Sequence, residues 1–354
     1  MTAKRGVAIS LFSGAGGLDL GVESAGFDVA AAVENDRDAA ETMEKNFHGL
    51  ANEVIRKDIR EVTTESILRA AGLRGNARPD LLIGGPPCVA FSKSGFWLDW
   101  KRAGEDPKAG LLATYTRVLT EARPRAFLFE NVYALTYKNA VSRKWFDLLL
   151  GEIQKAGYQF EWRVMNSADF GVPQLRPRVF VVGTHKGETP PTFPVPSYGG
   201  RWEGRHTGDP STRHVTVGQA LEGLVSEREP QEVIRGKWGH LLPEVPPGEN
   251  YLHFTAKRGH PDPLFEWRSR YWNFLLKLDP SKPSPTIQAQ PGPNVGPFHW
   301  ENRRLRVPEL KRLFTFPDDF QFVGSRLSVQ RQIGNSVPPL LAESVAAELA
   351  RTLT

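Results

Sequence analysis

Residues 7–21 read VAISLFSGAGGLDLG, a short apolar run that ends in a glycine-rich turn. The β-branched and aromatic residues of its first half are typical of a buried strand. Glycines let the backbone turn sharply and approach a ligand with no Cβ in the way. A helix is expected to open directly after this turn. The spacing Gly14-x-Gly16-Gly17 is shorter than the dinucleotide-binding pattern Gly-x-Gly-x-x-Gly, so the turn alone does not identify a ligand.

The alternation of strand-like and helix-like stretches continues to about residue 185. Further strands are predicted at 27–33, 81–83, 126–129 and 179–183, with helices at 37–47 and 145–156. Strands that alternate with helices form βαβ units, so we predict an α/β fold with a doubly wound, mostly parallel sheet. Polar residues follow several of these strands, and the ligand crevice of an open α/β sheet lies at such carboxyl ends.

A second, smaller domain is predicted from the change in composition after about residue 184. Residues 186–300 are rich in proline, glycine and tryptophan and show only weak periodicity. Apolar positions at helical spacing return over residues 338–353. We therefore predict a first domain from residues 1–185 and 301–354, and a loop-rich second domain from residues 186–300.

Composition limits the classes of protein that this chain can represent. The chain has 45 Lys and Arg against 40 Asp and Glu, and this net charge of +5 permits a nucleic-acid partner without requiring one. No run of 18 apolar residues could span a membrane and the N-terminus does not resemble a signal peptide, so a cytoplasmic location is expected. The single cysteine, Cys88, excludes an intramolecular disulfide, and the histidine spacing predicts no metal site.

Two carboxylates follow predicted strands near the glycine turn. Glu34 ends the second strand, 20 residues after Gly14, where a carboxylate can accept hydrogen bonds from both hydroxyls of a ribose. Asp58 follows a third strand, where an acceptor suits an exocyclic amine such as that of adenine. Either residue alone could be a solvated loop charge. Together they favour an adenosine-type cofactor.

Cys88 follows a strand and two prolines that fix the approach of the backbone. A lone cysteine is more often a small core residue, but the polar, glycine-containing stretch after it favours a nucleophile. Glu130 ends another strand that faces the same crevice. Arg176 and Arg178 adjoin the strand at 179–183, and a cation near Cys88 would favour its thiolate. The arginines could equally bind phosphate or lie solvated at the surface.

In this combination the chain resembles the cytosine-5 DNA methyltransferases over almost its whole length. The motifs that carry the resemblance, in order, are LFSGAGGLDLG (11–21), VEND (33–36), GGPPCVAFS (84–92), ENV (130–132), QLRPR (174–178) and RQIGNSVPPLLA (331–342). The resemblance implies a fold of the S-adenosylmethionine-dependent methyltransferase type. It implies transfer of a methyl group from S-adenosylmethionine to C5 of a flipped-out cytosine in a specific double-stranded DNA sequence.

The resemblance also assigns roles to individual residues. Cys88 would add to C6 of the cytosine, Glu130 would protonate N3, and Arg178 would contact O2, with Arg176 supporting a loop or a phosphate. The cofactor site would be lined by Phe12, Gly14, Gly16 and Leu18, with Glu34 at the ribose, Asp58 and Ile59 at the adenine, and Asn335, Ser336 and Val337 completing the pocket.

For DNA binding, the resemblance makes residues 186–300 the target-recognition domain and the remainder the catalytic domain. The expected DNA contacts are Ser92 and Ser94 in the loop after Cys88, Arg258, Arg268 and Arg270 in the recognition domain, and Thr286 at a phosphate near the target. Tyr271 and Trp272 are further candidates. We expect a monomer, with a cognate restriction endonuclease that acts separately.

The chain departs from the family pattern at a few positions. Val89 replaces the glutamine usual after the catalytic cysteine, and Pro308 stands where many members have arginine before the matching Glu309. Two alternatives stay open at this point. One is a tRNA cytosine-5 methyltransferase of the same family, whose recognition segment is usually shorter. The other is a catalytically silent DNA-binding relative, against which the intact Cys88, Glu130 and Arg178 argue.

Overall fold

The computed structural model describes residues 6–47, 53–87, 110–202, 205–209, 211–268 and 271–353. The chain divides into two compact units, each of which is described by itself. The first unit comprises Met1–Asn166, Pro177–Val195 and Ser336–Thr354, and the second comprises Ser167–Arg176 and Pro196–Asn335. The second unit is therefore inserted between parts of the first.

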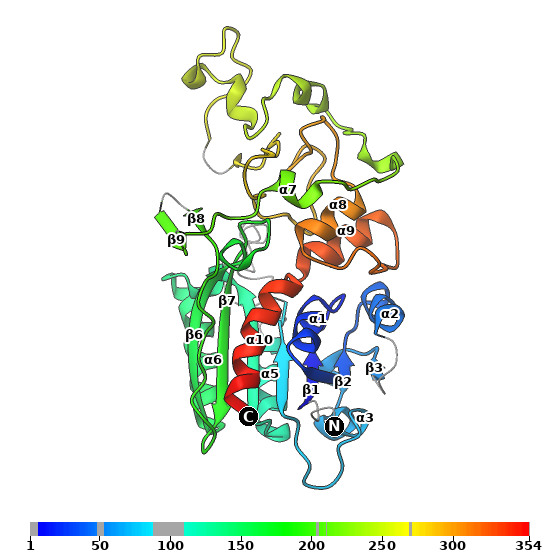
Figure 1. The fold of residues 1–354 in the computed structure, drawn as a ribbon, viewed down its shortest axis with the longest axis vertical. Coiled ribbons are helices and arrows are strands. Elements are labelled where there is room, and N and C mark those ends of the chain that lie inside the picture. The colour runs from blue at the N-terminus through cyan, green and yellow to red at the C-terminus, as the bar shows by residue number, and fades with distance from the viewer. Residues whose placement is uncertain are drawn as a thin grey trace. The chain divides into compact units, whose positions relative to one another are not determined.

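A seven-stranded sheet forms the centre of the first unit (Figure 1), in the order β3-β2-β1-β4-β5-β7-β6. The strands are β1 (Gly6–Leu11), β2 (Phe27–Val33), β3 (Glu53–Ile55), β4 (Leu81–Gly84), β5 (Ala126–Val132), β6 (Tyr158–Asn166) and β7 (Pro177–His185). Strands β1 to β5 pair in parallel, while β7 runs antiparallel to both β5 and β6. The predicted α/β fold with a mostly parallel, doubly wound sheet is confirmed.

The strand order reverses between β1 and β4. From β1 the chain proceeds outward to β2 and β3, and it then returns to place β4 on the other side of β1. Leu11, at the end of β1, lies opposite Gly84, at the end of β4. Loops that leave such neighbouring strands diverge, and this is the point where open α/β sheets bind their ligands.

Helices cover both faces of the sheet. They are α1 (Gly17–Ser24), α2 (Arg37–Asn46), α3 (Thr64–Ala70), α5 (Gly110–Ala122), α6 (Ala140–Lys155) and α10 (Pro339–Leu353), with the short 3-10 turns η1 (Ile59–Glu61) and η3 (Tyr133–Thr136). Side chains of α3, α5 and α6 form one core with alternate residues of the strands. Tyr115 of α5, for example, meets the ring of Phe129 of β5 edge to face at 5.2 Å.

The last helix packs on the first (Figure 1). A Cβ on Gly21 of α1 would lie 2.4 Å from the Cβ of Ala342 and 2.5 Å from the carbonyl oxygen of Pro339. Only glycine allows this approach, because real Cβ atoms do not come so close to other atoms. The LDLG end of the first motif thus fixes the position of α10 through its glycine.

The second unit is rich in loops. Its regular elements are the antiparallel hairpin of β8 (Gly199–Trp202) and β9 (Arg205–Gly208), the helices α7 (Val217–Leu221), α8 (Val307–Leu313) and α9 (Arg326–Asn335), and the 3-10 turns η4 (Ser167–Phe170), η5 (Pro230–Glu232), η6 (Gly239–Glu244), η7 (Tyr251–Phe254) and η8 (Ala256–Arg258). A small core holds residues 241–298 together around Leu242, Phe254 and Phe298.

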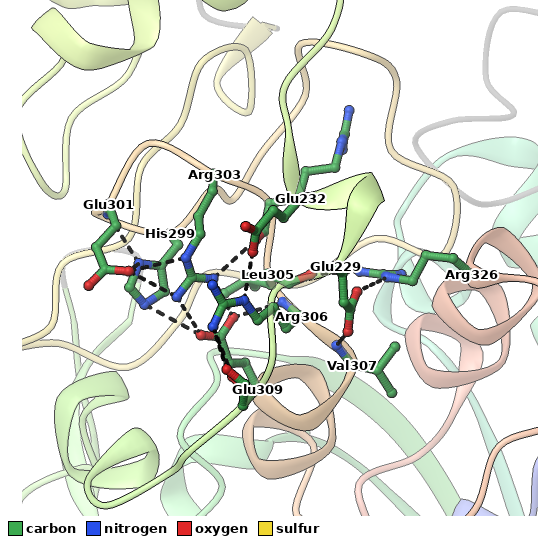
Figure 2. Close-up of polar contacts among 12 residues, drawn as sticks. Glu229, Glu232, His299, Glu301, Arg303, Leu305, Arg306, Val307, Glu309 and Arg326 are labelled. Carbon is green, nitrogen blue, oxygen red and sulfur yellow. Dashed lines mark hydrogen bonds and ion pairs between the residues drawn. The ribbon is translucent and has the colours of Figure 1, made fainter.

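The compact units differ in extent from the predicted domains. Residues 167–176 and 301–335 belong to the second unit, and residues 186–195 belong to the first. Figure 2 shows one reason, a network of charged side chains. Arg306 Nε donates to Glu232 at 2.6 Å, Arg326 Nε donates to Glu229 at 3.0 Å, and Arg303 binds the carboxylate of Glu309 through two nitrogens. The contacts of Arg306 and Arg326 tie the start of α8 and the start of α9 to the segment that carries Glu229 and Glu232.

Candidate active site

Glu130 and Arg178 form a buried ion pair in the first unit. In the β5–β7 ladder, Val132 lies opposite Arg178 and Glu130 lies opposite Phe180, so the two charged side chains are diagonal neighbours on one face. Arg178 Nε lies 3.0 Å from Glu130 Oε1, and the two side chains are only 12% and 10% exposed. Burial lowers the pKa of Arg178 from its usual value, and the charge of Glu130 opposes this shift. The pair presents a carboxylate and a cation at one place.

The segment that leads to Cys88 lies against this pair. Asn131 Nδ2 donates to the carbonyl oxygen of Pro86 at 2.9 Å, which fixes the backbone after β4 to the end of β5. A Cβ on Gly85 would lie 2.9 Å from Glu130 Oε2. Asn131 and Gly85 belong to the ENV and GGPPCVAFS motifs, but no local pattern assigned a role to either residue. Pro87 is the last described residue of this segment.

Four of the predicted site residues lie outside the described residues. They are Cys88, Ser92 and Ser94 after β4, and Arg270 in the second unit. Their predicted roles stay predictions.

Glu34 connects the glycine turn to the end of β2. Its Oε2 accepts a hydrogen bond from Gly14 N at 2.7 Å, and its Oε1 accepts one from Asp36 N at 2.8 Å. Gly14 and Gly16 have φ values of 58° and 83°, in the left-handed region that glycine adopts without strain. Burial raises the pKa of Glu34, and the two backbone donors oppose this shift. An ionised carboxylate has about four acceptor sites, so two hydrogen bonds leave acceptor capacity for a ligand.

The other predicted cofactor residues lie in different environments. Both oxygens of Asp58 accept hydrogen bonds from Arg60, whose side chain lowers the pKa of Asp58 to about 2. An adenine amine would therefore compete with Arg60 at this carboxylate. Ile59 and Leu18 are buried, and Phe12 is half-buried. Ser336 and Val337 are buried in the first unit, whereas Asn335 ends α9 in the second.

Asp19, in the first turn of α1, is a buried acid that was not predicted as a site residue. Its side chain is fully buried, and neither oxygen has a well-formed hydrogen bond among the described residues. Burial raises the pKa of Asp19 from 3.8 to about 7, and the neighbouring Ser10 hydroxyl offsets only part of this shift. No local pattern marks this residue as buried, since an aspartate in a first helical turn is usually solvated.

Arg176 lies in the core of the second unit. Its guanidinium donates to the carbonyl oxygens of Gly334 at 2.6 Å and Ile287 at 3.3 Å, and it lies 4.9 Å from the ring of Phe314. The Thr286 hydroxyl donates to Leu175 O at 2.7 Å, which occupies its one O–H donor. These contacts give both residues a packing role in this unit. The phosphate contact expected of Thr286, and the support of a loop or a phosphate expected of Arg176, stay predictions.

The structure contains no group of three or more potential metal ligands among the residues it describes. Within the same residues, no helix is both long enough and apolar enough to cross a membrane. Arg258 and Arg268, predicted to contact DNA, are exposed in the second unit.

Comparison with known proteins identifies the class of this fold and site. Residues 7–351 match the family described as C-5 cytosine-specific DNA methylase. The Type II methyltransferase M.SacI of Streptomyces achromogenes is 46% identical over 98% of this chain and 93% of its own length. M1.HphI of Haemophilus parahaemolyticus, also a Type II methyltransferase, is 32% identical over 98% of this chain and 87% of its own length.

A solved structure agrees with these relatives. A protein described as a DNA modification methyltransferase, encoded within a prophage of E. coli, superposes with a TM-score of 0.64 and 26% identity, over 98% of this chain and 99% of its own. The chain therefore belongs to the C-5 cytosine-specific DNA methylase family. Its activity is that of a DNA cytosine-5-methyltransferase, and this reading is favoured over an RNA methyltransferase or a silent relative.

Proposed function

We propose that this enzyme methylates C5 of a flipped-out cytosine in a specific double-stranded DNA sequence, with Cys88 as nucleophile, Glu130 as proton donor and Arg178 as a contact to the base. The observation that supports this most is the buried Glu130–Arg178 pair, against which the backbone leading to Cys88 lies. Taking the target cytosine out of the duplex costs a few kcal/mol, which contacts to the enzyme must offset.

The proposed chemistry solves the problem that C5 of cytosine is a poor nucleophile. The Cys88 thiolate forms a bond to C6 while Glu130 transfers a proton to N3, so C5 becomes the nucleophilic carbon of an enamine. After C5 has received the methyl group, a base removes the C5 proton. The C6–S bond then breaks, the thiolate of Cys88 is restored, and N3 returns its proton to Glu130. S-adenosylmethionine, when bound, supplies the methyl group as an electrophile.

The geometry of the ion pair supports a division of labour within the Glu130 carboxylate. Oε1 is held by Arg178, while Oε2 lies toward the backbone of Gly85, three residues before Cys88. We therefore assign the proton transfer to Oε2. Arg178 fixes the orientation of the carboxylate, and its own orientation is fixed because it also donates to Pro177 O at 2.7 Å.

The residues of the glycine turn fit an adenosine-containing cofactor. Glu34 is anchored by two backbone donors and retains acceptor capacity for ribose hydroxyls. A Cβ added to Gly14 would meet nothing within 4 Å, whereas one on Gly16 would lie 2.6 Å from the ring of Phe47. Gly14 thus leaves the turn open, and Gly16 allows it to pack on Phe47. The other residues proposed to hold the cofactor are Phe12, Leu18, Asp58, Ile59, Asn335, Ser336 and Val337.

Sequencing of 5-methylcytosine in DNA treated with the pure protein and S-adenosylmethionine tests the proposal directly. Methylation should appear at one recurring duplex sequence, and it should be lost with the Cys88→Ala variant. Methylation of transfer RNA but not of duplex DNA would instead support the RNA alternative.

The relatives are named Type II methyltransferases. We propose accordingly that the enzyme acts as a monomer in the cytoplasm and modifies sites that a separate restriction endonuclease cleaves.

Replacing Gly85 by alanine should lower the rate of methyl transfer by about 100-fold, since displacement of a catalytic group by about 1 Å has effects of this size. The new Cβ would lie 2.9 Å from Glu130 Oε2 and would force this carboxylate to move. Gly151→Ala is a matched control, because a Cβ at this helical position meets nothing within 4 Å. Single-turnover methylation assays should separate the two variants. Equal rates would show that Glu130 tolerates the shift.

Stability should fall as the pH rises from about 4 to above 7, because Asp19 must ionise in a buried site. Its pKa is raised by folding from 3.8 to about 7. The contribution of Asp19 is thus complete below pH 3.8 and is lost as the pH passes through 7, to a total of up to about 4 kcal/mol. The Asp19→Asn variant should lose this dependence. Urea unfolding at several pH values would measure it, with Asp147→Asn, an exposed change on α6, as the control. Parallel pH profiles for all three proteins would contradict the assignment.

A further inference from the structure

A fully buried carboxylate follows the glycine turn of the first unit. Asp19 belongs to the first turn of α1, and its side chain is closed to solvent. Neither of its oxygens has a well-formed hydrogen bond among the described residues. No step of the proposed mechanism uses this residue. Buried acids are usually paired or hydrogen-bonded, so Asp19 requires either a retained proton or a partner from outside the chain.

Two serine hydroxyls connect Asp19 with the turn that is proposed to hold the cofactor. Ser13, within the turn, is half-buried, and its Oγ donates to Ser10 Oγ at 2.8 Å. The Ser10 hydroxyl therefore keeps its own proton for Asp19, and it favours the ionised carboxylate, which opposes the effect of burial on the pKa of Asp19. A hydroxyl can donate to an ionised carboxylate and accept from a protonated one. Ser10 thus suits both states of Asp19.

The charges that act on Asp19 are negative. Burial raises the pKa of Asp19 to about 7, and the charges of Glu23 and Glu34 add to this shift. Among the described residues, no Lys or Arg forms an ion pair with Asp19 or Glu34. Strand β1 carries no charged residue, and the charged residues of β2 and α10, the elements that pack on α1, are Asp28, Glu343, Glu348 and Arg351, the last two paired with each other. The surroundings of Asp19 are therefore complementary to a positive charge.

We propose that Asp19 is the negative counter-charge for the cationic sulfur of S-adenosylmethionine, and that it gives up its proton to solvent when this cofactor binds. The proposal rests on the proposed function, since the cofactor is the methyl donor of that reaction. S-adenosylhomocysteine, which remains after methyl transfer, lacks one methyl group and the positive charge at sulfur. An ionised Asp19 therefore favours the donor over this product, and a protonated Asp19 does not. Asp19 acts on the cofactor through its charge and is not a catalytic residue.

Calorimetric titration of the full-length protein at several pH values tests this proposal. It measures the Kd of both compounds and, in buffers of different ionisation enthalpy, the number of protons released. Between about pH 6 and 8, the Kd of S-adenosylhomocysteine divided by that of S-adenosylmethionine should rise about 10-fold more for the unmodified protein than for Asp19→Asn, within the usual range of coupling between two bound groups. Protons that the ligands themselves exchange are common to both proteins, so the difference between the proteins isolates Asp19.

Two further variants make the test independent of the folding of Asp19→Asn. Ser10→Ala removes the hydroxyl that favours the ionised acid, so the rise of the Kd ratio should move to higher pH. Asp147→Asn, at an exposed position of α6, should behave like the unmodified protein. A protein that neither binds S-adenosylmethionine nor methylates DNA would contradict the proposed function. An active enzyme whose Kd ratio depends on pH in the same way with and without Asp19, or with and without the Ser10 hydroxyl, would overturn the present proposal alone.

Discussion

The Cys88→Ala variant should lose methyl transfer to DNA by about 10⁴-fold or more, the usual consequence of removing a catalytic nucleophile. Without a thiolate to add at C6, C5 of cytosine stays a poor nucleophile. The glycine turn and Glu34 belong to other segments and are not altered, so binding of S-adenosylmethionine should persist. Transfer of a radiolabelled methyl group measures the rate, and equilibrium dialysis measures cofactor binding. Normal turnover by the variant would exclude a covalent mechanism through Cys88.

A mechanism-based substrate gives an independent test of the same step. Duplex DNA with 5-fluorocytosine at the target should form a covalent complex with the enzyme that survives denaturing electrophoresis. Fluorine at C5 cannot leave as a proton, so the C6–S bond is not broken. The Cys88→Ala variant should form no such complex. If unmodified DNA is methylated under the same conditions but the fluorinated duplex is not trapped, addition at C6 is wrong.

The second large effect is expected at Glu130. The Glu130→Gln variant keeps the shape of the side chain but cannot transfer a proton to N3, so kcat should fall by about 10²- to 10⁴-fold. The substitution also leaves the Arg178 guanidinium, only 12% exposed, without its charged partner. Loss of one partner from a buried pair costs about 3–5 kcal/mol, so thermal unfolding must be measured beside activity.

A control separates the two consequences of this substitution. Glu161→Gln, on the exposed side of β6, should alter neither activity nor unfolding. At a temperature where Glu130→Gln is fully folded, the loss should appear in kcat rather than in KM for DNA. A folded Glu130→Gln enzyme with kcat close to that of the unmodified protein would rule out proton transfer by this residue.

Much of the first unit could be predicted from local patterns, but the exact position of the Glu130–Arg178 pair could not. The strands before Glu130 and after Arg178 are recognisable from their apolar residues. Glu130 and Arg178 were expected just beyond the ends of these strands. In the structure both lie within the strands, because β5 extends to Val132 and β7 begins at Pro177. Their inclusion depends on the antiparallel pairing of segments that lie more than 40 residues apart in sequence. No local pattern encodes this pairing.

The residues predicted to bind the cofactor divide in a similar way. Glu34 lies where the spacing from Gly14 predicted, because a strand, a turn and a helix of ordinary length fix that distance. Asp58 was expected to meet a ligand, but the next charged residue, Arg60, occupies its oxygens. The extent of the second unit was also beyond prediction. The pair of Arg306 with Glu232 joins residues 74 positions apart, and that of Arg326 with Glu229 joins residues 97 positions apart.

The close packing of Gly21 against Ala342 has a consequence for biosynthesis. Helix α10 follows the whole second unit in the chain, yet it packs on α1, which directly follows the glycine turn. After the strands of the sheet have been synthesised, the ribosome must still synthesise most of the second unit before α10 can pack on α1. The nascent chain therefore cannot complete this face of its sheet early, and methylating activity should appear only after residues 339–353 have left the exit tunnel.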